Sequence, residues 1–290
     1  MIRIRFVSLV LLFSFITLTA FTASAQMPRE RVLSAQPAEE LFWAPSVIIQ
    51  PSSTQINRGN LDFTIQHAFG LLSGGVKSLY GLDDPANIRF GLDYGVNDRI
   101  AVGVGRSRYN KTFDWRTKVL LRGSSQLKVN AFSNVAIETV EDGRDLDQRL
   151  SYYTGLILSR KISGRLFVQV MPAWSHFNLV EINDFLDGSI EEESNDHMVL
   201  GVAMRYQHSN RVSVLVDYLP VFGDRSDNTN NVLSFGLDLE AGGHVFQMFF
   251  STTQWITPQH AVSKSKRSIT SRDFGFGFNV HRRFSGPSRN

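Results

Sequence analysis

Apolar residues recur at every second position through most of the chain after residue 60. The clearest case is the segment 271–284. One of its faces carries Phe274, Phe276, Phe278, Val280 and Phe284, and the other carries Asp273, Gly275, Gly277, Asn279 and His281. Successive side chains of a β-strand point to opposite faces, so a period of two predicts a strand. This strand needs an apolar medium on one side and a polar or crowded space on the other.

The same period predicts twelve strands in all. Many of them are about ten residues long, the length that a tilted strand needs to cross a bilayer. The predicted strands are 61–69, 88–95, 100–105, 113–122, 127–138, 150–162, 165–177, 197–207, 211–219, 231–240, 244–253 and 271–284.

The connections between these strands alternate in length. Tight turns built from Gly, Asn, Asp or Ser occupy residues 95–98, 123–125, 163–164, 208–210 and 241–243. The other connections, except the short 110–112, are long and polar, at residues 70–86, 139–149, 180–196, 221–230 and 257–270. Short periplasmic turns and long extracellular loops are typical of outer-membrane barrels.

We therefore predict an all-β fold, an antiparallel up-and-down transmembrane β-barrel of about twelve strands whose last strand pairs with the first. A soluble β-sandwich also has short alternating strands. It would bury the phenylalanine face of residues 271–284, however, and would not sort its loops by length.

The N-terminus predicts export. Arg3 and Arg5 precede an apolar run at residues 6–21, and Ala23-Ser24-Ala25 completes a cleavage site, so residues 1–25 are expected to be a cleaved signal peptide. A single membrane anchor is the alternative. Residues 26–60 are rich in proline and polar residues and form either a periplasmic lead-in or plug segment or a flexible linker. The barrel is expected to occupy residues 61–290.

Composition narrows the function classes. The chain has 290 residues and no Cys, which excludes disulfides, thiolate metal sites and a Cys nucleophile. Removing Arg3 and Arg5 from the 30 basic residues leaves 28 against 27 acidic ones, and this balance gives no case for nucleic-acid binding. After the signal, no apolar run approaches the roughly 18 residues of a spanning helix.

Charged residues on the polar faces of the strands predict a mixed-charge lumen. On the lipid face, Arg or Lys at midplane would cost about 2–4 kcal/mol, so the register is expected to turn these residues inward. They either line a permeation path or pair across a closed lumen. The candidate lumen-lining residues are Arg89, Asp93, Arg116, Lys118, Lys128, Glu138, Arg205, Asp217, Asp238 and Asp273.

Several short runs carry a resemblance to a known family. They are His67-Ala68-Phe69-Gly70, the run Ile88-Arg89-Phe90-Gly91-Leu92-Asp93-Tyr94-Gly95, and Gly243-His244-Val245-Phe246-Gln247. Together they resemble an uncharacterised family of exported outer-membrane β-barrel proteins of Gram-negative bacteria, across roughly residues 61–284. The resemblance implies a barrel fold and an outer-membrane location. It implies no catalytic or binding residue, because the family has no established activity.

Three other motifs have weaker functional readings. The triplet His208-Ser209-Asn210 suggests an outer-membrane lipid hydrolase, but a tight turn accounts for its Ser and Asn. The acidic loop around Glu191, Glu192 and Glu193 is either a cation site or simply solvated. The basic run at residues 263–267 either contacts lipopolysaccharide or the acidic loop, or is solvated.

We predict a non-enzymatic outer-membrane barrel without cofactor or metal, most simply a pore or transporter for small polar solutes. The alternative is a closed structural or surface-display barrel that acts through its loops or a periplasmic partner. Expected partners are outer-membrane lipid, lipopolysaccharide and the barrel-assembly machinery. The candidate assembly signal is the aromatic face of the last strand, Phe274, Phe276, Phe278 and Phe284.

Overall fold

The computed structural model describes residues 40–180, 182–184, 190–192, 194–223, 225 and 229–285. The predicted signal peptide, residues 1–25, lies outside the described residues, as does the stretch 26–39. The description below concerns the unit that these residues form.

Strands dominate this unit. They are β1 (Leu61–Ala68), β2 (Asn87–Gly95), β3 (Ile100–Ser107), β4 (Phe113–Gly123), β5 (Leu127–Ile137), β6 (Leu150–Lys161), β7 (Leu166–Phe177), β8 (Ile182–Asp184), β9 (Ile190–Glu192), β10 (Asp196–Gln207), β11 (Val212–Leu219), β12 (Val221–Phe222), β13 (Val232–Ala241), β14 (His244–Ser251) and β15 (Gly275–Phe284). The helical elements are η1 (Leu72–Ser78), η2 (Tyr109–Lys111), η3 (Asp147–Arg149) and α2 (Pro258–Ser263). Among the described residues, no helix is long and apolar enough to cross a membrane.

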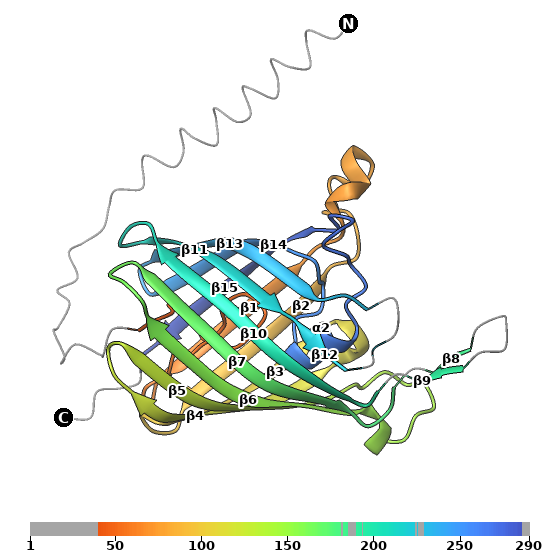
Figure 1. The fold of residues 1–290 in the computed structure, drawn as a ribbon, viewed down its shortest axis with the longest axis horizontal. Helices are drawn as coiled ribbons and strands as arrows, with labels where there is room; N and C mark the ends of the chain where they lie inside the picture. Colours follow the sequence, from red (N-terminus) through yellow and green to blue (C-terminus); the bar gives the residue numbers. More distant parts are fainter. Residues whose placement is uncertain are drawn as a thin grey trace, which may run out of the picture. The chain divides into compact units, whose positions relative to one another are not determined.

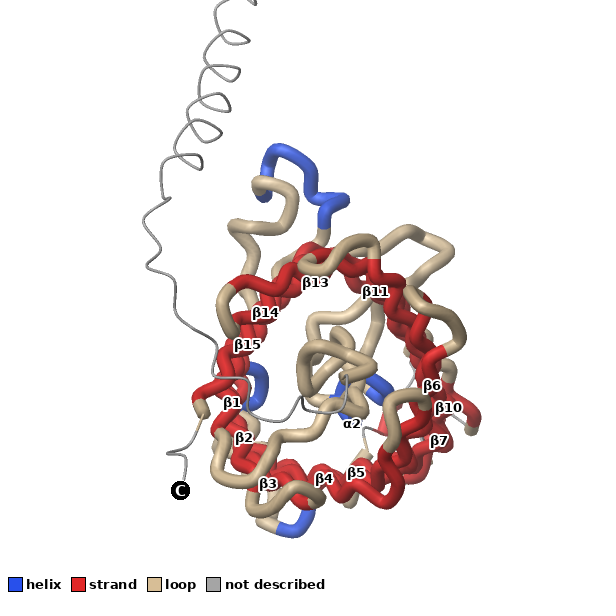
Figure 2. Tube along the Cα trace, turned by 90° about the vertical axis from the view of Figure 1, so that its left-hand side faces the viewer, coloured by secondary structure: helices blue, strands red, loops and turns tan. Residues whose placement is uncertain are grey.

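The strands form a closed antiparallel barrel (Figures 1 and 2). Each strand pairs with its neighbours in the ring, and β15 closes it by pairing with β1 from Leu61 opposite Phe284 to Ala68 opposite Gly277. The short β12 pairs only with β10, and β8 and β9 form a separate hairpin, so twelve strands make up the ring. The predicted fold class, strand number and closure are confirmed.

Alternating burial along each strand shows which face points inward. In β2, Phe90, Leu92 and Tyr94 are exposed, whereas Arg89 and Asp93 are buried. In β15 the residues of the phenylalanine face are half-buried or exposed, and the intervening Gly275, Gly277, Asn279 and His281 are buried. The apolar residues thus face outward, as expected for strands in contact with lipid.

The two ends of the barrel differ as the connection lengths predicted. We call the end with the five tight turns the turn end and the opposite end the loop end. β1 begins and β15 ends at the turn end, where Leu61 also lies opposite Tyr94. The predicted last strand was too long at its start, because β15 begins only at Gly275. The loop before it contains α2, whose six residues are all buried, so this part of the predicted solvated loop folds back into the barrel.

A stretch of chain also fills the barrel from within. Figure 2 shows it as the loop inside the ring of strands, next to α2. We call residues 40–56 the inner segment. All of it is buried except Glu40 and Trp43, which are half-buried. Residues 40–56 of the predicted linker or plug are therefore packed inside the ring, whereas Asn57 and Arg58, which follow them, are exposed.

Candidate functional site

The inner segment is anchored by a buried carboxylate of β11. Asp217 Oδ2 accepts hydrogen bonds from the backbone amides of Ile48, Ile49 and Gln50 at 3.3, 2.8 and 3.1 Å. Its Oδ1 accepts one from Gln50 Nε2 at 2.6 Å. Three successive amides around one carboxylate form a backbone nest. Asp217 therefore holds the inner segment to the wall.

Basic side chains hold the carbonyl groups of the same segment. Lys118 Nζ donates to the carbonyl oxygens of Ser52 and Thr54 at 2.7 and 3.0 Å. Arg205 Nε donates to Leu41 O at 2.8 Å, and its guanidinium lies over the Trp43 ring at 4.7 Å. Near the start of the segment, Lys128 pairs with Glu40 at 2.5 Å. These contacts come from β4, β5 and β10, so the segment is tied to several sides of the ring.

A serine–histidine–aspartate line adds a further anchor at β15. Ser46 Oγ lies 3.3 Å from His281 Nε2, and His281 Nδ1 lies 3.0 Å from Thr64 Oγ1 and 3.4 Å from Asp62 Oδ1. Hydrolases use such an arrangement. Here the cavity beside Ser46 is about 40 Å³, room for about three water molecules and no acyl substrate. We assign this line to anchoring the inner segment.

One half of the inner wall carries a large apolar cluster beside charged residues such as Arg205 and Asp217, which the sequence pattern did not predict. Inward-facing hydrophobic residues of β5, β6, β7, β10, β11, β13 and β14 form one buried cluster with the inner segment and α2. The inner segment contributes Leu41, Phe42, Val47, Ile48 and Ile49. Burying a large apolar side chain is worth about 1.5–3 kcal/mol. The inner segment is therefore bound to this side of the barrel by both packing and hydrogen bonds.

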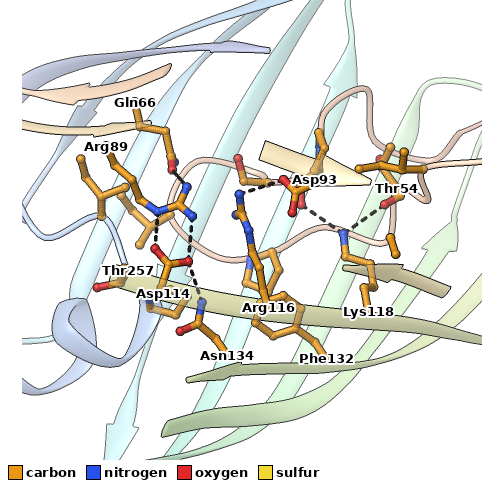
Figure 3. A pocket seen from close by; sticks show the side chains of 18 residues that line it. Thr54, Gln66, Arg89, Asp93, Asp114, Arg116, Lys118, Phe132, Asn134 and Thr257 are labelled. Atoms are coloured by element: carbon orange, nitrogen blue, oxygen red, sulfur yellow. Dashed lines mark hydrogen bonds and ion pairs between the residues drawn. The ribbon is translucent and has the colours of Figure 1, made fainter. Parts of the chain in front are cut away.

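The other half of the wall, on β1 to β4, is mainly polar and carries a ladder of ion pairs (Figure 3). Arg89 binds Asp114 through two hydrogen bonds of 2.8 and 2.7 Å and also donates to Gln66 at 3.0 Å. Arg116 pairs with Asp93 at 2.8 Å. Asp114 accepts a further bond from Asn134 at 3.2 Å. We call Arg89, Asp93, Asp114, Arg116 and Lys118 the charge ladder.

Glycines on the inward faces of β2 and β3 make room for the ladder. A Cβ at Gly105 would collide with the Arg89 guanidinium and lie 2.6 Å from Asp114 Oδ2. A Cβ at Gly91 would lie 2.7 Å from both Arg89 Nη1 and Arg116 Nη2. The guanidinium groups therefore lie flat on the wall, where any larger residue would displace them.

A small cavity separates the inner segment from this polar wall. It has a volume of about 40 Å³. From the wall, Gln66 and all five residues of the charge ladder line it, and Pro45, Ser46 and Thr54 of the inner segment line the opposite side. The gap between inner segment and wall thus lies on the polar side, whereas packing closes the apolar side.

A much larger cavity, which we call the vestibule, opens at the loop end. Its volume is about 680 Å³. Glu138, just after β5, ties α2 to its floor: His260 Nε2 donates to Glu138 Oε1 at 3.0 Å, and Lys264 Nζ does so at 2.9 Å. These bonds and Lys264 hold the pKa of Glu138 well below its usual range. Burial lowers the pKa of His260, whose Nδ1 accepts a 2.7 Å bond from Thr257.

The predicted lumen-lining residues fall into three groups. Eight are in strands and face inward: Arg89, Asp93, Arg116, Lys118, Lys128, Arg205, Asp217 and Asp238. Glu138 lies at the vestibule. Asp273 is not part of the wall, because it precedes β15 and its Oδ2 accepts a bond from the Ser268 amide within the loop. The residues that the prediction missed are mostly neutral, such as Gln66, Asn134, Gln169 and Gln247, or lie in the inner segment. For these neutral side chains, the signal available in the sequence was the alternation of polar and apolar residues along each strand.

The remaining motifs have simple structural roles or fall outside the described residues. Ser209 Oγ accepts a hydrogen bond from the Val212 amide at 3.1 Å, so turn chemistry accounts for the His208-Ser209-Asn210 triplet. In the basic run, Lys264 binds Glu138 and Arg267 donates to Phe69 O at 3.1 Å. The side chains of the acidic loop around Glu191 lie outside the described residues. Within the described part of the chain, no group of acidic or His side chains is arranged to hold a metal ion.

Comparisons with known proteins agree with the fold. Residues 42–284 match the family model described as "Membrane bound beta barrel domain (DUF5777)". No curated protein matches the sequence significantly. Among solved structures, the NanC porin is 8% identical with a TM-score of 0.49, covering 79% of this chain and 100% of that one. The COG4313 outer-membrane channel from Pseudomonas putida F1 is 12% identical with a TM-score of 0.46, covering 80% and 97%. With TM-scores below 0.5, neither contributes to the functional inference.

Proposed function

Because the chain belongs to the DUF5777 family of membrane-bound β-barrel domains, we propose that it is an outer-membrane channel for small polar solutes. The alternation of tight turns and long loops supports the outer membrane, as does the predicted signal peptide. We further propose that the inner segment restricts the channel and that solutes pass along the charge ladder.

The observation that carries this proposal is the asymmetry of the inner wall. On one side the inner segment packs against a continuous apolar cluster. On the other side the 40 Å³ cavity lies between the segment and the wall, and the wall lines it with the charge ladder and a few apolar residues such as Ala101 and Phe132. Water and polar solutes are more easily accommodated next to charged groups than next to buried hydrocarbon. If the inner segment moved slightly away from the wall that β1, β2, β3 and β4 form, this cavity would widen into a continuous polar path.

A closed structural barrel is the competing function. Such a barrel is served by the same anchors, since Asp217, Lys118 and Arg205 hold the inner segment in place. It does not by itself require ion pairs lying flat against glycines beside a cavity. The two functions differ in a measurable way, because only the channel conducts.

Single-channel recording on the refolded or purified chain in planar bilayers tests the proposal. We expect discrete conductance that increases when Asp217→Asn weakens the hold on the inner segment. We also expect Arg116→Gln to shift the reversal potential in a KCl gradient towards cation selectivity, because it removes a positive charge from the path. Arg99→Gln, at an exposed turn, is the matched control. The channel function is refuted if three proteins all fail to conduct at every voltage. They are the parent chain, Asp217→Asn and the chain that lacks residues 26–57.

A further inference from the structure

The vestibule has the size and composition of a small-molecule site. Its volume of about 680 Å³ falls within the range of about 300–1,000 Å³ that is usual for such sites. Aromatic residues Tyr109, Phe177 and Trp255 line part of it. Hydroxyl and amide side chains, among them Asn110 and Gln254, line much of the rest. A site of this kind suits a ligand with several hydroxyl groups and some apolar surface.

The charges around the vestibule do not balance. Its lining includes four basic residues, Arg144, Lys264, Lys266 and Arg267, and two acidic ones, Glu138 and Asp142, which gives a net charge of +2. Arg144 and Lys264 are neutralised by the two carboxylates at 2.5 to 2.9 Å.

The excess charge resides on two neighbouring residues. Within the described residues, neither Lys266 nor Arg267 forms an ion pair, and Arg267 Nη1 is buried without a hydrogen-bond partner. Burial lowers the pKa of Arg267 to about 10, so its guanidinium stays charged at neutral pH. Asp84 and Asp273 act on the charge of Arg267 without forming an ion pair with it among the described residues. The positive charge that remains in the lining of the vestibule attracts an anion.

The vestibule is held in shape by the barrel, so it needs little rearrangement to bind. Gln254 Nε2 donates to Phe69 O at 2.7 Å, and Tyr109 Oη donates to Gln254 Oε1 at 3.1 Å. Trp255 meets Tyr109 edge to face at 5.2 Å and donates from Nε1 to Lys264 O at 2.9 Å. A preformed site loses little conformational entropy on binding.

We propose that the vestibule binds small polyhydroxylated organic anions, of the size and chemistry of a sugar acid, with the carboxylate at Lys266 and Arg267. Binding at the loop end raises the local concentration of such anions above the polar wall. Their onward passage rests on the proposed channel function, whereas the binding itself does not.

Isothermal titration of the full chain in detergent with three sugars of the same ring tests this site. The probes are sodium glucuronate, glucose and glucosamine hydrochloride, at low salt because screening weakens charge interactions. We expect glucuronate to bind at least tenfold more tightly than glucose, and glucosamine to give no heat of binding. Equal affinity for glucuronate and glucose overturns the proposal.

Variants locate the binding within the vestibule. Lys266→Gln removes an exposed cation that forms no ion pair with any described residue. We expect about a fivefold loss of glucuronate affinity, the effect of one nearby charge in a partly aqueous site. Arg267→Lys keeps the charge but loses the planar fork, and we expect a smaller loss. Lys77→Gln, an exposed cation of η1, is the matched control and is expected to change nothing.

Unchanged affinity in Lys266→Gln and Arg267→Lys overturns the site even if glucuronate binds elsewhere. The outcome is separable from that of the channel test. A conducting barrel that binds glucuronate no better than glucose refutes the vestibule site alone. A non-conducting barrel with the expected binding refutes the channel alone.

Discussion

Substituting Asp217 with Asn should loosen the inner segment. The carboxylate of Asp217 accepts four hydrogen bonds from the inner segment, three from backbone amides and one from Gln50 Nε2. An amide keeps one acceptor oxygen but presents an NH₂ group to donors that need an acceptor. The substitution thus leaves buried backbone amides without partners.

The size of the effect follows from these bonds. A hydrogen bond to a charged group contributes about 1.5–3 kcal/mol, and removing one partner of a buried charged network costs about 3–5 kcal/mol. The bonds around one carboxylate are not additive, and the apolar contacts of the segment remain. We therefore expect the free energy of displacing the segment to fall by about 3–4 kcal/mol, which raises the displaced population by about 10²- to 10³-fold.

The absence of Cys from the chain makes this population measurable. Ser53 lies in the inner segment and is fully buried, and its hydroxyl has no hydrogen-bond partner among the residues that the structure describes, so Ser53→Cys is a nearly neutral reporter. Its maleimide labelling rate, in purified protein, follows the displaced population when reclosing is fast. Ser209→Cys in an exposed turn corrects for intrinsic reactivity.

We expect maleimide to label Ser53→Cys two to three orders of magnitude faster when Asp217→Asn is also present. This factor equals the expected increase in the displaced population. Asp83→Asn, at an exposed position of a long loop, should leave the rate unchanged. If Asp217→Asn labels as slowly as the parent while Ser209→Cys labels normally in both, the carboxylate does not hold the segment and the reasoning is refuted.

Three further substitutions test other parts of the barrel. Gly105→Ala should displace Arg89 and lower the free energy of unfolding, measured in urea, by about 1–3 kcal/mol. Gly164→Ala, which has open space at its Cβ, should leave this free energy unchanged. Equal stability of the two variants contradicts the packing of the charge ladder. Burial lowers the pKa of His260 and keeps its ring neutral. The contribution of neutral His260 to the free energy of unfolding is therefore complete above its ordinary pKa of 6.5, and it is lost as the pH falls below 6.5. The parent should therefore lose more thermal stability than His260→Gln between pH 7.5 and 5.5, and equal losses count against this. Phe284→Ala should lower the amount of barrel assembled in the membrane, measured by heat-modifiable migration on gels; undiminished assembly removes Phe284 from the assembly signal.

The wall of the barrel was predictable from sequence because its cause is local. Each strand repeats the same contrast between lipid outside and another medium inside, so a period of two appears in the sequence wherever a strand crosses. The tight turns are equally local, since Gly, Asn and Ser supply the backbone conformations they need. The start of β15 was placed too early because Asp273 and Phe274 continue the alternation although they lie in the preceding loop.

The contents of the barrel were less predictable because their cause is not local. Leu215 and Phe167 face inward, but in sequence they resemble lipid-facing residues, and only the inner segment explains why hydrocarbon is tolerated there. Asp217 was identified as an inward-facing charge, yet its partners lie more than 160 residues earlier in the chain. The buried helix α2 was missed because its sequence, Pro-Gln-His-Ala-Val-Ser, is short and largely polar, as in a solvated loop.

The position of the inner segment has a consequence for how the protein is assembled. The segment precedes β1 in the chain, yet it touches the last strand, where Asn279 Nδ2 donates to Ile48 O at 3.1 Å and His281 lies beside Ser46. Its full set of contacts is therefore complete only when β15 has joined β1. Docking of the inner segment and closure of the barrel are thus one cooperative event. In this event the segment serves as a template around which the sheet closes. A chain that lacks it would have to close over a half-apolar hollow filled with water.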